Sequence, residues 1–298
     1  MAAATNSSPP LRVWLYGAIL AASVLASLVP LRLKFGRDMG VIAAAYTQRF
    51  LIAPSHQDSA RVVGLGSSLL WAATPPAAYE SLEGVHWMRL TKSGGGIGYL
   101  RAVFDVFDKT PPSVLVIDAN LLLPSTPAFV VEEMRYAFTQ AVSNVLYPVM
   151  ERIGIPHPLS QKVLSDQRRP FGCEPVQAEA LKKQTARWIR EQNAFYANAA
   201  VDPEIRDRLM HLAQRGVRIV VLELRRSAPL DQGSATEKQR WLERWQAVLP
   251  PGPSVSYLIS PVIQDAAMYC DGRHMNALGA SRFTPWWTAQ LQQMAKGY

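Results

Sequence analysis

Short apolar runs alternate along the chain with longer stretches in which apolar residues recur every three or four positions. Five short runs are rich in Val, Ile and Leu and end at Gly, Pro, Asn or Ser, which is typical of strands buried on both faces. They span residues 61–65, 85–90, 113–118, 217–224 and 254–260. Helical patterns cover residues 69–80, 97–109, 127–151, 176–199, 202–215, 235–248 and 277–294. Strands separated by helices predict right-handed crossovers, so we expect one doubly wound α/β domain over residues 60–298 with helices on both faces of a parallel sheet.

The gap between the third and fourth predicted strands is longer than a single crossover needs. Residues 124–200 hold two helical stretches joined by proline-containing loops, among them Arg168-Arg169-Pro170-Phe171-Gly172-Cys173. Ligands bind at the carboxyl edge of such sheets. We therefore interpret residues 124–200 as a helical insertion that covers this edge.

The amino terminus carries a separate apolar segment. Residues 13–31 contain 19 uncharged positions, with Trp14 and Tyr16 near the start. At ~1.5 Å per residue this length just crosses a hydrocarbon core of ~30 Å. We predict an uncleaved transmembrane anchor between a short tail, residues 1–12, and a linker, residues 32–59. A cleaved signal peptide is the alternative, because Val24-Leu25-Ala26 is an acceptable cleavage site.

Composition and charge narrow the class of protein. The 298 residues are 49% hydrophobic and 18% charged, which excludes a disordered, fibrous or multi-span membrane protein. The net charge is +8, but the first 37 residues hold four cations and no acid, so the domain itself does not have the charge of a nucleic-acid-binding protein. The cations after the apolar segment would favour a cytoplasmic domain, although long domains often translocate regardless of such charges. Two cysteines provide neither a disulfide scaffold nor a zinc-ribbon array.

Three predicted strand ends carry small or polar groups that would meet at one edge of the sheet. Ser67-Ser68 follows the first strand at a helix start, where a serine can be an exposed nucleophile or only an N-cap. Gly94-Gly95-Gly96 follows the second strand and can present backbone N–H groups to a ligand or form a plain tight turn; it fits neither a P-loop nor a dinucleotide fingerprint. Asn120 follows the third strand and can donate to an oxyanion or serve as a turn residue.

The most specific segment is Asp271-Gly272-Arg273-His274-Met275-Asn276, between the fifth strand and the last helix. A carboxylate three residues before an imidazole can bind its Nδ1–H and raise its basicity, leaving the other nitrogen to take a proton from a serine. A surface turn with Asn276 as a helix cap is the simpler alternative. The other histidines have no partner at a metal-ligand spacing, so we predict neither a metal nor a cofactor.

Taken together, these blocks resemble the SGNH/GDSL hydrolase superfamily over residues 60–295. The resemblance implies a flavodoxin-like, three-layer α/β/α fold with a five-stranded parallel sheet. Its pattern also departs from that family at two positions. Ser67 replaces the usual Asp of the first block, and Asp118 replaces the usual glycine of the Asn120 block, which also lacks the Asp that follows.

These departures and the predicted anchor resemble the membrane-tethered branch of the superfamily, which includes DltD and the alginate O-acetylation proteins AlgJ and AlgX. That branch implies a single-pass protein of the bacterial inner membrane with its catalytic domain in the periplasm. It also implies a polysaccharide substrate and a membrane-bound O-acyltransferase or glycan synthase as partner.

The resemblance also assigns roles to individual residues. Ser68 is the expected nucleophile, with Ser67 as the fallback, His274 the general base and Asp271 the residue that orients it. Gly94, Asn120 and the Ser68 N–H are the expected oxyanion hole.

Three arginines and two cysteines indicate a ligand contact and a disulfide, but less specifically. Arg225, Arg226 and Arg273 lie at the same predicted edge and can bind an anionic glycan or simply be solvated. Cys173 and Cys270 can form a disulfide in an oxidising compartment or remain free thiols, as a cytoplasmic location would predict.

These observations favour a periplasmic acyl-ester hydrolase or O-acetyltransferase acting on an exopolysaccharide such as cellulose or alginate. The alternative is a catalytically idle module of the same fold that binds glycan or acts as a scaffold for the acyltransferase or synthase.

Overall fold

The computed structural model describes most of the predicted α/β domain and a small part of the amino terminus. The described residues are 13–20, 23, 60–75, 82–93, 95–124, 171–173 and 176–296. Residues 13–20 and Ser23 are helical, and none of the described helices has the length and apolarity needed to cross a membrane. Most of the predicted anchor and linker, the predicted helix at 127–151 and Gly94 lie outside the described residues.

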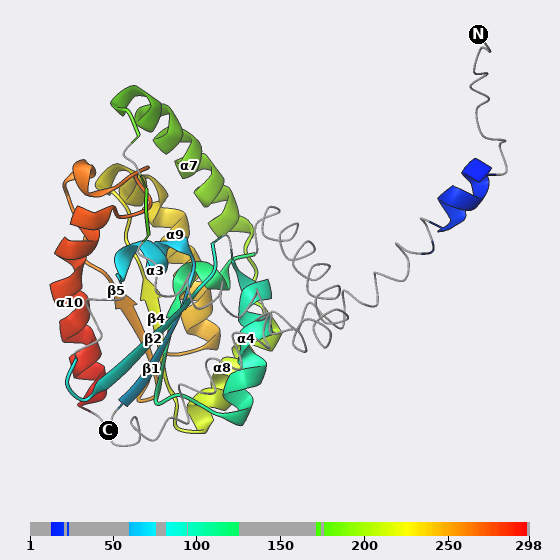
Figure 1. Ribbon diagram of the computed structural model, residues 1–298. Helices are drawn as coiled ribbons and strands as arrows, with labels where there is room; N and C mark the ends of the chain where they lie inside the picture. Colours follow the sequence, from blue (N-terminus) through cyan, green and yellow to red (C-terminus); the bar gives the residue numbers. More distant parts are fainter. Residues whose placement is uncertain are drawn as a thin grey trace, which may run out of the picture.

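Five parallel strands form the sheet (Figure 1). They are β1 (Ala60–Gly66), β2 (Val85–Thr91), β3 (Val114–Asp118), β4 (Arg218–Glu223) and β5 (Val255–Ile259), in the order β2-β1-β3-β4-β5. This is the strand order of flavodoxin-like sheets, in which ligands bind outside the carboxyl ends of the strands. The predicted parallel sheet is confirmed, and each strand end lies within one residue of its predicted position.

Helices cover both faces of the sheet, with α10 on one side and α4 and α8 on the other (Figure 1). Helices α4 (Ile97–Lys109), α8 (Pro203–Gln214) and α9 (Ala228–Val248) share one core, and α3 (Ser68–Ala73) and α10 (Ala277–Ala295) share the other. Successive strand residues point to opposite faces, so Val63 enters the first core and Val62 the second. Full burial of one such large apolar side chain contributes about 1.5–3 kcal/mol.

Two predicted helix boundaries were wrong for local and tertiary reasons. Helix α3 ends at Ala73 rather than continuing through Thr74 and Pro75, because the residue before a proline is disfavoured in the helical region. Helix α9 begins at Ala228 rather than at residue 235 and includes Gly233. A Cβ at Gly233 would lie 2.5 Å from Ile189 Cδ1, so a neighbouring helix requires the glycine that lowered the local helix propensity.

That neighbour is α7 (Ala178–Asn198), the described helical part of the insertion. It packs along α9, and both lie toward the same end of the domain (Figure 1). Three α7 residues, Gln192, Phe195 and Tyr196, line a cavity at the carboxyl ends of β1 and β3. The described part of the insertion therefore reaches the sheet edge at which it was expected.

A buried ion cluster joins α9 to the end of β4. Lys238 Nζ lies 2.9 Å from Glu223 Oε1 and 2.5 Å from Asp231 Oδ1. Burial acts to lower the pKa of Lys238, but the two carboxylates outweigh it and the pKa is raised, so the ammonium stays charged. The cluster therefore depends on the cation to balance two acids away from water.

Candidate active site

Three of the four predicted blocks meet at the carboxyl edge of the sheet. Leu65 of β1 pairs with Ile117 of β3, which places the residues after both strands side by side. Ser68 begins α3 directly after β1, and Asn120 lies in the short 3₁₀ helix η3 (Ala119–Leu122) after β3. The histidine segment arrives at this edge after β5 and the 3₁₀ helix η4 (Ala266–Met268).

Ser68, His274 and Asp271 form a continuous hydrogen-bonded chain. Ser68 Oγ lies 2.8 Å from His274 Nε2, across 206 residues of sequence. On the other side of the ring, His274 Nδ1 lies 2.9 Å from Asp271 Oδ2. The structure therefore places in contact the three residues predicted to act together.

A tight turn holds the carboxylate against the ring. Asp271 Oδ1 accepts the backbone N–H groups of Arg273 and His274, each at 2.9 Å. Gly272, between Asp271 and Arg273, has φ +78°, a left-handed conformation that favours glycine over any residue with a Cβ. The spacing of three residues thus produces the contact because the intervening turn is closed by the carboxylate itself.

The electrostatics of this turn favour an ionised Asp271. Burial acts to raise the pKa of Asp271, but hydrogen bonds from His274 and the two backbone N–H groups outweigh it and hold the pKa well below its usual range. An ionised Asp271 accepts the Nδ1–H of His274. The Nε2 lone pair is then directed at the Ser68 hydroxyl, which is the arrangement needed for proton abstraction.

An aromatic side chain and a disulfide from the insertion hold the histidine in place. Phe171 stacks on His274 with ring centroids 5.1 Å apart, and Trp71 packs edge-on against Phe171 at 5.4 Å. Cys173 is disulfide-bonded to Cys270, with a Cα–Cα distance of 6.0 Å and a sequence separation of 97. The pairing that the sequence left open therefore attaches the insertion to the residue before Asp271.

The two adjacent serines have different roles. Ser67 is buried, donates its hydroxyl to Asp118 Oδ2 at 2.5 Å and accepts the Leu69 N–H at 3.2 Å as the N-cap of α3. Ser68 is partly exposed and contacts the imidazole. The geometry therefore selects Ser68 as the candidate nucleophile, and the fallback Ser67 is excluded.

Asp118 is a functional residue that the sequence did not reveal. Its Oδ2 also accepts the Ser67 N–H at 3.0 Å, and its Oδ1 accepts the backbone N–H and Nδ2 of Asn120 at 3.0 and 2.8 Å. One buried carboxylate thus joins the turn that carries Ser68 to the turn that carries Asn120. The available signal was that Ser67 and Asp118, the two departures from the SGNH pattern, lie at the carboxyl ends of neighbouring strands.

The orientation of the Asn120 amide is set from two sides. Its Oδ1 accepts a hydrogen bond from Arg226 Nη2 at 2.5 Å, while its Nδ2 donates to Asp118. The second Nδ2 hydrogen remains for a ligand in the cavity that Asn120 lines together with Ser68. The Ser68 N–H, at the first position of α3, has no acceptor within the helix. Two of the predicted oxyanion donors thus belong to residues that line the cavity, and the third, Gly94, is outside the described residues.

The three arginines grouped by sequence occupy different environments. Arg226 is buried at 1% exposure and also donates to Tyr196 Oη at 3.1 Å. Burial acts to lower the Arg226 pKa, but neighbouring Tyr196, Glu223 and Asp118 outweigh it and raise the pKa. Its interactions make Arg226 a residue that positions Asn120, a role different from the substrate binding predicted for it.

Arg225 and Arg273 differ in whether they line the cavity. The Arg225 side chain is 38% exposed, lies 3.7 Å from Asp231 and is not among the described lining residues, so its predicted substrate contact stays a prediction. Arg273 does line the cavity, and its guanidinium lies 4.3 Å from the ring centre of Trp188.

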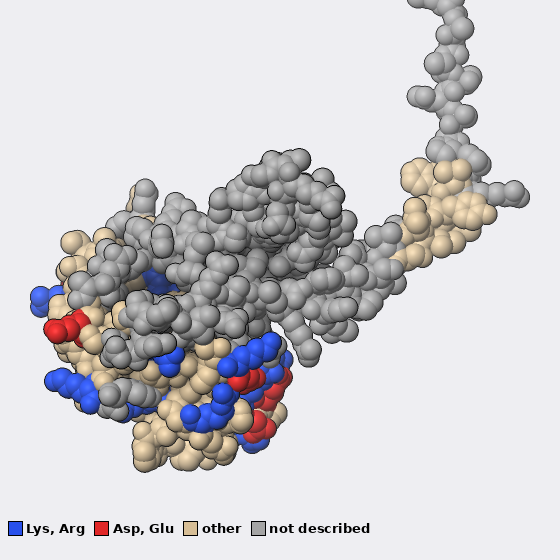
Figure 2. All heavy atoms as spheres, turned by 60° about the horizontal axis from the view of Figure 1, so that its bottom comes forward, with Lys and Arg blue, Asp and Glu red and all other residues tan. Residues whose placement is uncertain are grey.

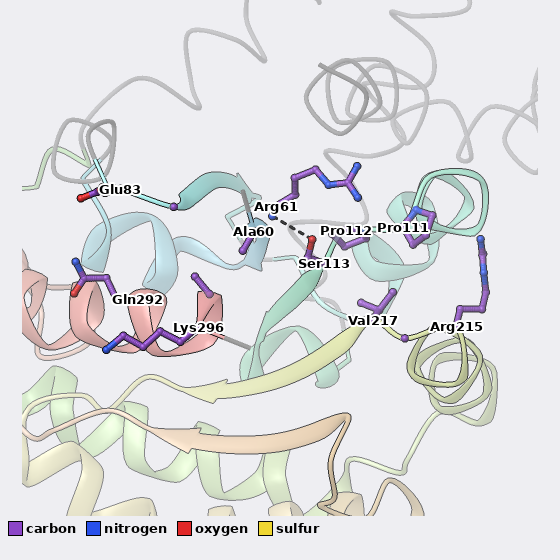
Figure 3. Close-up of a pocket in the computed structure, with 13 residues that line it drawn as sticks. Ala60, Arg61, Glu83, Pro111, Pro112, Ser113, Arg215, Val217, Gln292 and Lys296 are labelled. Atoms are coloured by element: carbon purple, nitrogen blue, oxygen red, sulfur yellow. Dashed lines mark hydrogen bonds between the residues drawn. The ribbon is translucent and has the colours of Figure 1, made fainter. Parts of the chain in front are cut away.

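A larger hollow of about 940 Å³ lies at the opposite edge of the sheet (Figure 3). Its lining includes residues at the amino-terminal ends of the strands, among them Arg61 and Ser113, which are joined by a 3.2 Å hydrogen bond from the Arg61 N–H. None of the triad residues lines it. The cavity beside Ser68 has only about 90 Å³, but it is lined by the candidate nucleophile Ser68 and by the polar residues Asn120 and Arg273.

Basic and acidic side chains are interspersed on the part of the face that Figure 2 colours. Within the described ranges, no group of three or more His, Cys, Asp or Glu residues is placed to hold a metal ion.

Comparison with known proteins adds little beyond this geometry. No known family profile and no curated protein sequence matches the chain. Among solved structures, it is similar to a Streptococcus pneumonia protein described as a "putative platelet activating factor", with 11% identity and a TM-score of 0.39 over 91% of this chain and 99% of the other. At that TM-score the fold assignment rests on strand order, and the functional assignment rests on the contacts around Ser68.

Proposed function

We propose that this protein is a serine acyl-ester hydrolase or O-acyltransferase of the SGNH type. The observation that carries the proposal is the Ser68–His274–Asp271 chain beside two hydrogen-bond donors. In the reaction, Ser68 Oγ attacks the ester carbonyl carbon while His274 Nε2 takes its proton, and Asp271 stabilises the resulting imidazolium. His274 then returns the proton to the departing alcohol, leaving the acyl group on Ser68.

The carbonyl oxygen becomes negatively charged in the tetrahedral intermediate. The Ser68 N–H and the free Nδ2 hydrogen of Asn120 stabilise this oxyanion, and Asp118 and Arg226 hold the amide in place beforehand. Loss of one such donor typically costs about 3–4 kcal/mol of transition-state stabilisation. Water or a sugar hydroxyl then attacks the acyl-enzyme, which gives hydrolysis or transfer respectively.

The resemblance of the sequence to the alginate O-acetylation proteins favours a short acyl group. We therefore propose acetyl esters as the substrate class.

We place this activity on an exopolysaccharide such as cellulose or alginate, in the periplasm of a bacterium. The family resemblance of the sequence supports this location, with residues 13–31 as the inner-membrane anchor and a membrane-bound O-acyltransferase or glycan synthase as the partner. The Cys173–Cys270 disulfide supports it independently, because such bonds persist in oxidising compartments. A carboxyl-terminal alkaline phosphatase fusion, active only after export, tests it; a fusion inactive in cells would contradict a periplasmic domain.

The activity is tested on the purified full chain with a chromogenic acetyl ester. We expect Ser68→Ala to lower kcat/KM by at least about 10³-fold, because the nucleophile is removed. Ser281→Ala, at an exposed position on α10, is the matched control and should match the wild type. Equal turnover by wild type and Ser68→Ala would reject the enzyme and favour the idle glycan-binding module.

A further inference from the structure

The cavity beside Ser68 contains a buried amide that has no hydrogen-bond partner. Gln192 of α7 is 7% exposed and lines this cavity, yet within the described part of the chain neither its Nε2 nor its Oε1 has a partner. Buried side-chain amides are normally paired, since an unpaired one gives up its bonds to water without replacement. An unpaired amide at the wall of a cavity therefore indicates a polar ligand that the cavity receives.

Arg273 provides a cation at the same wall. Its guanidinium lies against the face of Trp188, and across the described chain it forms neither a hydrogen bond nor an ion pair. Burial first, and then the neighbouring cation Arg226, lower the Arg273 pKa. A guanidinium in this state can bind a planar anion with two parallel hydrogen bonds.

No carboxylate of the described chain forms an ion pair with this cation, although Asp271 and Glu191 act from a greater distance to raise its pKa. Both oxygens of Asp271 accept hydrogen bonds from the catalytic turn, and Glu191 is 2.7 Å from Arg187. Arg226, the second cation of the wall, is already bound to Asn120 and Tyr196. The wall thus has one guanidinium without an ion-pair partner among the described residues and one unpaired amide, in the same cavity as the nucleophile.

We propose that Arg273 and Gln192 form a specificity subsite for an anionic group, a carboxylate, carried by the ester substrate. The carboxylate binds the Arg273 guanidinium while the Gln192 amide donates to it or to an adjacent hydroxyl. The inference rests on the proposed esterase function and adds to it that acetyl esters of acidic sugars are preferred over those of neutral sugars.

The kinetic test compares acetylated glucuronate with acetylated glucose, two sugars that differ only in a carboxylate against a hydroxymethyl group. The full chain should show a higher kcat/KM for the acidic ester. In Arg273→Gln the ratio of the two kcat/KM values should fall roughly tenfold to a hundredfold, mainly through KM. Gln192→Leu, of similar size, should lower the same ratio. Arg225→Gln, at a position that is not among the described lining residues, should leave it at the wild-type value.

A binding test separates this subsite from the catalytic proposal. In the Ser68→Ala full chain, glucuronate should raise the melting temperature and glucose at equal concentration should not, and adding Arg273→Gln should abolish the shift. A glucuronate-specific shift in a wild type that hydrolyses neither ester would support the subsite while rejecting the esterase. Equal shifts with both sugars, or an unchanged kinetic ratio in Arg273→Gln and Gln192→Leu, would overturn the subsite.

Discussion

Replacing Asp118 by asparagine tests whether a single buried carboxylate aligns the nucleophile with the oxyanion donor. Each carboxylate oxygen accepts two hydrogen bonds, so Asp118 serves four donors on Ser67 and Asn120. An asparagine amide has the same shape but offers only one acceptor oxygen. Its NH₂ group must face one pair of donors, and we expect it to face Ser67, because that hydroxyl can turn and accept.

The backbone N–H of Ser67 then loses its acceptor in a buried position, and the bond to Asn120 loses its charged partner. A buried donor left unsatisfied costs about 1–3 kcal/mol, and loss of the charge adds to it, so we expect Asp118→Asn to lower the free energy of unfolding by about 2–4 kcal/mol. If about half of this loss appears in the transition state, kcat/KM falls about tenfold, since 1.36 kcal/mol corresponds to one factor of ten.

Urea unfolding monitored by tryptophan fluorescence measures the first quantity, and acetyl-ester kinetics on the same preparation measure the second. Asp265→Asn is the control: this carboxylate accepts the Ala267 N–H at 2.8 Å in an exposed turn away from the cavity. It should change stability by less than about 1 kcal/mol. Unchanged unfolding and unchanged kcat/KM in Asp118→Asn would refute the view that this carboxylate couples the two turns.

Three further changes test other parts of the architecture. The lowered pKa of Asp271 means that its contribution to stability is present above the ordinary aspartate pKa of ~3.9 and is lost as pH falls toward the lower pKa of the folded state. The difference in urea stability between wild type and Asp271→Asn should therefore shrink as pH falls from 5 toward 3. Replacing Cys173 and Cys270 by alanine should lower the free energy of unfolding by up to about 4–5 kcal/mol, which is the chain-entropy value for a sequence separation of 97. An equal melting temperature of the wild type with and without reductant would contradict the bond. Lys238→Met should lower the free energy of unfolding in urea by about 3–5 kcal/mol, because Glu223 is left buried without its cation. Stability equal to that of the wild type would show that the ion cluster is dispensable.

The periodicity of the sequence was sufficient to predict the layered α/β domain. Each strand is a short apolar run with both faces buried, so its limits are visible in the local pattern, and the predicted ends were correct to within one residue. Helix limits were less secure where a tertiary contact decided them, as at Gly233, which α7 requires but local propensity disfavours. Local preference is thus informative only where the tertiary environment does not oppose it.

The candidate triad was also predictable, because the turn from Asp271 to His274 is local and parallel strands bring their carboxyl ends to one edge. The choice of Ser68 over Ser67 was not, since both have the same side chain and only the positions of Asp118 and His274 separate them. The same holds for Arg226, which the sequence placed beside Arg225 but the structure buries against Asn120.

The sequence by itself determined which chemical groups follow which strand, because that order is covalent and the alternation of buried residues is local. Only the tertiary structure decided which of those groups touch: the Asp118 carboxylate between two strands, the disulfide across 97 residues and the unpaired amide of Gln192 in the cavity wall. Hydrogen bonds act over about 3 Å, whereas sequence spacing constrains distance only within a few residues. Contacts between distant segments therefore depend on how the helices pack, which no local pattern contains.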